Sequence, residues 1–146
     1  MAPAGRQRAV TLLEMLLAVA LAGVLAAIAY PSYRAQLLRA HRLEAIEALL
    51  AAAAAQERFH LAHGRYADRF ATGSAAGLRL PAVTGGGRYE LALATPAPSD
   101  FIVRARPLPG SGQDEDGRCN ELWIRADGRR GASDRRGNDS TQACWG

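Results

Sequence analysis

An apolar block near the N-terminus is the strongest constraint on how this chain folds. Residues 15–29 carry no charged or strongly polar side chain, and the longer stretch 10–29 is interrupted only by Thr11 and Glu14. Twenty helical residues, at about 1.5 Å each, span roughly 30 Å, which is the thickness of a bilayer core. The whole chain has 146 residues, enough for one modest domain beside this block. The block argues against a freely soluble cytosolic protein and against a disordered chain.

The beginning of the chain fits three kinds of export signal or anchor. Arg6 and Arg8 precede the apolar block, as in a secretory signal peptide, and residues 27–29 (Ala-Ile-Ala) offer a cleavage site before Tyr30. The same pattern fits a transmembrane anchor that keeps the two arginines inside. In the third interpretation, a short leader is removed ahead of the block, which then stays on the mature protein.

Glu14 favours the third interpretation. A carboxylate inside an apolar helix costs about 2.5–3.5 kcal/mol on membrane insertion unless it finds a partner, and a signal peptide has no use for it. If the chain is cut after Ala9, the new α-amino group of Val10 lies four residues before Glu14, on the same face of a helix. The carboxylate would then pair with this amine or with that of a neighbouring subunit, which would set the register between packed helices.

This region resembles the type IV prepilin cleavage motif, in which a short basic leader precedes an apolar helix. The sequence Ala-Val-Thr-Leu-Leu-Glu-Met at residues 9–15 carries the resemblance. Residues 11–14 match the motif, whereas Ala9 and Val10 stand where the family generally has Gly and Phe. Pro31 is the twenty-second residue counted from Val10, where many pilins carry a proline that kinks the helix.

The resemblance implies a defined maturation. A prepilin peptidase would remove the leader 1–9 and methylate the amine of Val10, and the helix 10–34 would serve first as a membrane anchor and later as part of the filament core. Glu14 would pair with an N-terminal amine during assembly.

Helical signals continue beyond Pro31 as far as His63, where Gly64 provides a stop. A helix over residues 11–63 would be about 80 Å long, too long to pack wholly on one small domain. We therefore assign residues 35–63 to a globular domain that covers 35–146.

One stripe of this second helical half is expected to face the domain. Its members are Arg34, Leu37, Leu38, His41, Ala45, Ala48, Leu49 and Ala52, widened by Leu43, Ile46 and Leu50. Charged residues expected largely off the stripe are Arg39, Arg42, Glu44 and Glu47.

The remainder of the domain predicts a connecting loop and a small antiparallel sheet. The loop covers residues 64–87 and the sheet 88–132, within which alternating or compact apolar patterns mark strands. The expected strands are residues 89–93, 101–105 and 122–124, with a weaker one at 130–132. A long helix followed by short antiparallel strands predicts an α+β fold of the pilin type.

Cys119 and Cys144 are the two cysteines of the chain, and in an exported protein they are expected to pair. The alternative is two reduced thiols in a cytosolic protein. A bond closing the loop 119–144 would stabilise the fold by about 3 kcal/mol in the chain-entropy model and would hold the polar tail 133–146, which alone would be mobile. This loop resembles the disulfide-closed region of type IV pilins, most of all PilE-type minor pilins.

Motifs for catalysis, metals and cofactors are weak. His60 and His63 lack a third ligand at a recognised spacing, and the acidic stretch 114–116 departs from a calcium loop, so no metal site is expected. No nucleophile elbow or phosphate loop occurs, and we expect neither an enzyme nor a bound cofactor.

Four arginines cluster near the C-terminus and alternate with acids. They are Arg129, Arg130, Arg135 and Arg136. They predict either a mixed-charge surface or a patch that contacts DNA or another subunit.

The resemblance implies a structural role as a minor pilin. Expected partners are major and minor pilins, the prepilin peptidase, the inner-membrane assembly platform and membrane lipid before assembly, with nucleic acid left open. The protein would sit in the inner membrane with its C-terminal domain in the periplasm, then in an extracellular pilus that supports twitching motility, adhesion and DNA uptake. The alternatives are a type II secretion pseudopilin and an exported binding module cut after Ala29.

Overall fold

The computed structural model describes residues 11–73 and 77–146. The expected cleavage and methylation site at Ala9 and Val10 lies outside the described residues. One long helix, α1 (Leu12–His63), opens the described chain. The structure divides into two units, of which the first ends at Leu37 and the second is Leu38–Gly146.

The first unit consists of the apolar part of α1. Every residue from Thr11 to Leu37 is exposed, and α1 is long and apolar enough at this end to cross a membrane. The helix begins after Thr11, whose Oγ1 accepts a hydrogen bond from the backbone amide of Glu14 at 3.2 Å, the geometry of an N-cap. Pro31 lies inside α1, which continues through it; the expected kink stays a prediction.

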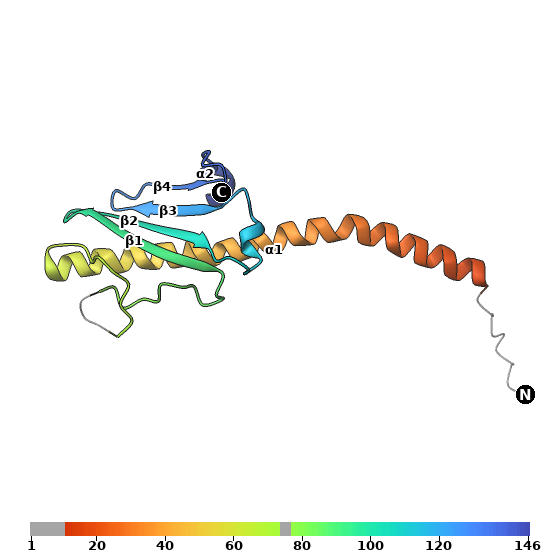
Figure 1. Ribbon diagram of the computed structural model, residues 1–146, viewed down its shortest axis with the longest axis horizontal. Coiled ribbons are helices and arrows are strands. Elements are labelled where there is room, and N and C mark those ends of the chain that lie inside the picture. Colours follow the sequence, from red (N-terminus) through yellow and green to blue (C-terminus); the bar gives the residue numbers. More distant parts are fainter. Residues whose placement is uncertain (1–10, 74–76) are drawn as a thin grey trace, which may run out of the picture. The chain divides into compact units, whose positions relative to one another are not determined.

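The second unit packs the later part of α1 on a four-stranded antiparallel sheet (Figure 1). Its strands pair in chain order and are β1 (Tyr89–Ala97), β2 (Asp100–Pro107), β3 (Glu121–Arg125) and β4 (Arg130–Ser133). A short 3-10 helix, η1 (Gln113–Glu115), lies between β2 and β3, and α2 (Thr141–Trp145) ends the chain. The α+β class and all four expected strands are confirmed.

The core forms between one face of the sheet and one face of α1. Alternate residues of β2 are buried, namely Phe101, Val103 and Ala105, as are Leu122 and Ile124 of β3. The helix contributes Ala45, Leu49 and Ala52, whose spacing of four and three residues places them on one face. Two of these three are alanines, and such small side chains let the helix backbone approach the sheet closely.

The expected apolar stripe of α1 was wrong at five positions. Four of its members, Arg34, Leu37, Leu43 and Leu50, are exposed, whereas Arg42, which was expected off the stripe, is buried. Arg42 precedes Ala45 by three residues and Leu49 by seven, so it lies on the face that meets the domain. The charge can be buried there because an acidic side chain from a loop distant in the sequence forms an ion pair with it.

Arg42 connects α1 to two other segments of the chain, one before β3 and one after β4. Its Nη2 donates to Oδ2 of Asp116 at 2.8 Å in a buried ion pair, and its Nη1 donates to the carbonyl oxygen of Ala143 at 3.1 Å. One turn earlier, the carbonyl oxygen of Leu38 accepts a hydrogen bond from Nε2 of Gln113 at 3.2 Å. The loop after β2 and the C-terminal helix are therefore held by the same stretch of α1.

We predict that Asp116→Ala destabilises the second unit by about 3–5 kcal/mol, because it leaves the Arg42 charge buried without its partner. Urea unfolding of the full chain in detergent, followed by near-UV circular dichroism, measures the loss. The double variant Arg42→Met/Asp116→Leu should recover most of it. An unchanged midpoint for Asp116→Ala would contradict this role of the pair.

Gly131 of β4 contacts two tryptophans. It pairs directly with Trp123 across β3 and β4, and a Cβ added to it would overlap the Trp123 ring. Nε1 of Trp145 also donates to the carbonyl oxygen of Gly131 at 2.9 Å. Because Gly131 has no side chain, the Trp123 indole can pack over β4. The hydrogen bond from the Trp145 indole attaches α2 to the same strand.

We predict that Gly131→Ala destabilises the fold by about 1–3 kcal/mol, the usual cost of overpacking, and shifts the tryptophan fluorescence. Gly85→Ala is the matched control, since a Cβ at Gly85 meets nothing within 4 Å. Equal melting temperatures for the two variants would contradict the packing argument.

Candidate functional site

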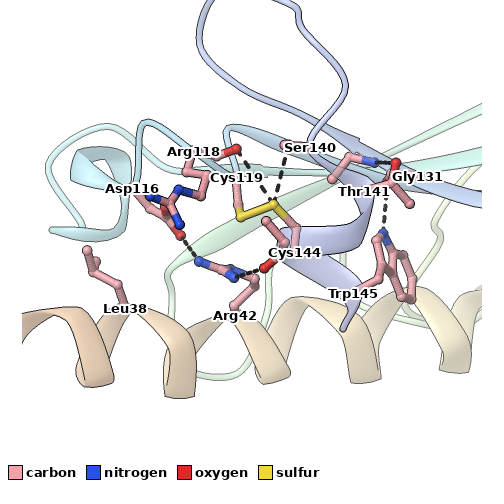
Figure 2. Close-up of a disulfide and its surroundings, with 12 residues drawn as sticks. Leu38, Arg42, Asp116, Arg118, Cys119, Gly131, Ser140, Thr141, Cys144 and Trp145 are labelled. Atoms are coloured by element: carbon pink, nitrogen blue, oxygen red, sulfur yellow. Dashed lines mark hydrogen bonds and ion pairs between the residues drawn. A yellow bond between two sulfur atoms is a disulfide. The ribbon is translucent and has the colours of Figure 1, made fainter.

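The two cysteines form the expected disulfide (Figure 2). Cys119 lies just before β3 and Cys144 lies in α2, both are buried, and their Cα atoms are 5.8 Å apart. The disulfide lies against α1, because Arg42 bonds the carbonyl oxygen of Ala143, the residue before Cys144.

The tail is held by more than the disulfide. The backbone amide of Ala132 donates to Oγ1 of Thr141 at 3.0 Å, and that of Ser140 donates to the carbonyl oxygen of Ala132 at 2.9 Å. With the Trp145 indole on Gly131, these bonds attach α2 to β4 at several points. The mobility expected for residues 133–146 without the disulfide stays untested, but the tail has its own attachments.

The arginine cluster near the C-terminus is largely engaged. Nε of Arg129 lies 2.6 Å from Oδ2 of Asp127, and hydrogen bonds from the Arg129 backbone and side chain lower the pKa of that carboxyl. The Arg130 guanidinium lies 5.3 Å from the centre of the Trp145 ring, and Arg135 donates to the carbonyl oxygen of Asp114. Of the two possibilities, the structure favours a mixed-charge surface.

The net positive charge of the chain is concentrated outside this C-terminal arginine cluster. Residues 58–89 hold five arginines and one acid, Asp68, while the rest of the chain holds thirteen arginines and thirteen acids. This segment thus accounts for the whole formal charge of +4. Among its arginines, Arg69 pairs with Asp68 at 2.9 Å and Arg88 with Glu44 at 3.1 Å.

Two further arginines of this segment share an open pocket at the C-terminal end of α1. The pocket has a volume of about 380 Å³. Its lining residues are Ala55, Arg58, Phe59, Ala62, His63, Gly77, Leu78 and Arg79. In the described parts of the chain, neither Arg58 nor Arg79 makes an ion pair or a side-chain hydrogen bond. Sequence reasoning missed this site because it looked for arginines that are adjacent along the chain.

Glu14 lies in the first turn of α1 and is exposed. No charged partner for it occurs among residues 11–73 and 77–146. Its expected partner, the amine of Val10 or of another subunit, lies outside what the structure describes.

The candidate metal ligands are not brought together. His60 stacks on Tyr66 and His63 stacks on Phe59, with ring centres 4.5 and 4.1 Å apart. Asp116 is engaged by Arg42. Within the described residues, no group of three or more potential ligands is placed to hold a metal ion.

Comparisons with known proteins gave matches to two family models and to a solved structure. A model of the prokaryotic N-terminal methylation motif matches residues 5–30. Among solved structures, the non-core minor pilin PilV of Neisseria meningitidis is 21% identical, with a TM-score of 0.49, over 68% of this chain and 91% of that chain. No match was found among curated proteins.

A second family model covers most of the second unit together with the end of the first. It is the model of the type IV minor pilin ComP, DNA uptake sequence receptor, and it matches residues 31–123, more than half of the chain. The protein therefore belongs to this family of type IV minor pilins.

Proposed function

We propose that the chain is a minor pilus subunit that binds DNA for uptake. It is made as a prepilin, cut between Ala9 and Val10, methylated on the Val10 amine and held in the inner membrane by residues 10–34, with the second unit in the periplasm. It then joins an extracellular type IV pilus. The observation that carries this proposal is the fully exposed apolar part of α1, joined to a folded domain of the minor pilin family.

The exposed apolar side chains of α1 are not covered by any other described part of the chain. The large ones are Leu12, Leu13, Met15, Leu16, Leu17, Val19, Leu21, Val24, Leu25, Ile28, Tyr30 and Tyr33. Each such side chain gains about 1.5–3 kcal/mol on full burial. Lipid supplies the burial before assembly, and the helices of other pilins supply it in the filament.

Maturation before Val10 fits this use better than cleavage after Ala29. Cleavage after Ala29 would discard the methylation motif at residues 5–30 and most of the apolar helix. The family match likewise favours a pilus over the type II secretion alternative. The proposed partners are other pilins, the prepilin peptidase and the inner-membrane assembly platform.

DNA binding is supported by the family and by charge. The ComP model is described as a DNA uptake sequence receptor, and the chain concentrates its net positive charge in residues 58–89. Unpaired guanidinium groups attract the phosphate backbone of duplex DNA, and the affinity of such contacts falls with salt. A structural subunit that binds DNA in this way needs no catalytic group.

We predict that the full chain in detergent binds duplex DNA with an affinity that declines linearly on a log–log plot against salt concentration. Fluorescence anisotropy with a labelled duplex measures both the affinity and the slope. A chain that is folded by circular dichroism yet does not bind duplex DNA even at about 50 mM salt would contradict the DNA-binding part of the proposal.

We predict that Glu14→Ala leaves the protein in the membrane but strongly reduces its incorporation into pili, because the N-terminal amine loses its partner. Immunoblots of sheared pili and of the membrane fraction measure the two pools. Glu14→Gln, which keeps the size but removes the charge, should fail in the same way. Normal incorporation of either variant would refute the proposed amine pairing.

A further inference from the structure

We propose that the pocket at the C-terminal end of α1 is a phosphate-binding notch for the DNA backbone, with Arg58 and Arg79 as its phosphate ligands. This inference rests on the proposed DNA binding and locates it on named residues. The notch is defined by the eight lining residues given above, all of which lie in the second unit.

Among the residues that the structure describes, neither arginine has a competing partner. Arg58 is exposed, and the residues one turn before and after it on α1 are Ala54, Ala55, Leu61 and Ala62, none of them acidic. Arg79 is exposed in a stretch, residues 69–89, that contains no acid at all. Both guanidinium groups therefore keep their full capacity for charge-assisted hydrogen bonds, which a phosphate accepts with good geometry.

The loop that carries Arg79 is fastened to α1. The Gln56 side chain is wholly buried and bonds both backbone groups of Ala67, donating to its carbonyl oxygen at 2.9 Å and accepting from its amide at 2.8 Å. Further along, Leu78 packs in a small core cluster with Ala55 and Phe59. The notch is thus formed before any ligand arrives, which lowers the entropy cost of binding.

Arg79 itself has an unfavourable backbone conformation. Its φ is +57°, and it is the one residue other than glycine with a positive φ in the parts of the chain described here. A residue with a Cβ pays for this left-handed geometry, so a glycine here would relieve it. Stability alone does not explain an arginine at this position, whereas a ligand for its guanidinium does.

The other wall of the notch is aromatic and apolar. The His63 ring stacks on Phe59, and its Nδ1 lies 3.0 Å from the carbonyl oxygen of Phe59. Because a carbonyl only accepts, Nδ1 carries the proton of this hydrogen bond, which holds the imidazole ring over Phe59. Together with Ala62 and Leu78, this wall suits the deoxyribose that adjoins each phosphate.

A nucleic acid fits the position better than a lipid headgroup. Within the second unit, Arg58 lies twenty residues along α1 from its first residue, Leu38, which is about 30 Å of helix. That length separates the notch from the membrane-proximal end of the unit. The phosphate of an anionic lipid is the competing ligand, and the experiment below distinguishes it from DNA.

The experiment measures duplex DNA binding by the full chain in detergent between about 50 and 200 mM salt. The test variant is Arg58→Ala/Arg79→Ala. Its matched control is Arg106→Ala/Arg129→Ala, which removes two arginines that are exposed but already paired with Glu121 and Asp127. We expect the test variant to bind about tenfold more weakly or worse, with a salt slope shallower by about 0.9 for each lost phosphate contact. The control should keep the wild-type slope.

A second variant separates binding from stability. Arg79→Gly should melt at the same or a higher temperature than the wild type, since glycine accepts a positive φ, yet it should bind DNA more weakly. A purely structural role for Arg79 would instead leave DNA binding intact.

Three outcomes would overturn the inference. If wild type and the Arg58/Arg79 double variant bind DNA alike, the notch is wrong while the proposed DNA binding stands. If the double variant loses binding to phosphatidylglycerol vesicles but not to DNA, the phosphate belongs to lipid. If the wild type binds no DNA, the proposed function fails and the notch fails with it.

Discussion

The exposed apolar part of α1 is the constraint on which the rest of the molecule depends. Residues 12–37 form a stretch of α1 in which every residue is exposed. The free energy of this surface falls when lipid or other helices cover it. The fold is consequently that of a subunit suited to assembly. Its second unit can be small because it does not have to bury the whole helix, and it uses α1 from Leu38 onward as its own scaffold.

That scaffold is joined to the domain by polar as well as apolar contacts. Arg42 connects α1 to Asp116 before β3 and to Ala143 beside the disulfide, so the loops at one end of the sheet and the C-terminus meet at one side chain (Figure 2). At the end of α1, Gln56 fastens the next loop in a similar way. Between these two anchors the sheet packs on alanines and Leu49. Arg58 and Arg79 therefore lie in a part of the domain whose helix and loop are fastened to each other.

Sequence reasoning predicted the long helix, its end at His63, the four strands and the Cys119–Cys144 bond, because each has a local signal: hydrophobic period, a glycine stop, alternation, or an isolated cysteine pair. It placed Arg42 on the wrong face, since polarity alone cannot show that Asp116, distant in sequence, will neutralise a buried charge. It missed α2, because a five-residue helix depends on tertiary bonds such as that from Trp145. It left open whether the arginines near the C-terminus form a mixed-charge surface or a contact patch, because only the structure shows that Arg129 and Arg135 bond Asp127 and Asp114.

The central claim is that the apolar helix is kept and used for assembly. Mass spectrometry of the N-terminal peptide, taken from the protein in sheared pili, tests it most directly. The account predicts a mature chain that begins with N-methylated Val10 and retains the whole of α1. A mature N-terminus at Tyr30 would mean that the apolar block is discarded, and it would contradict the account.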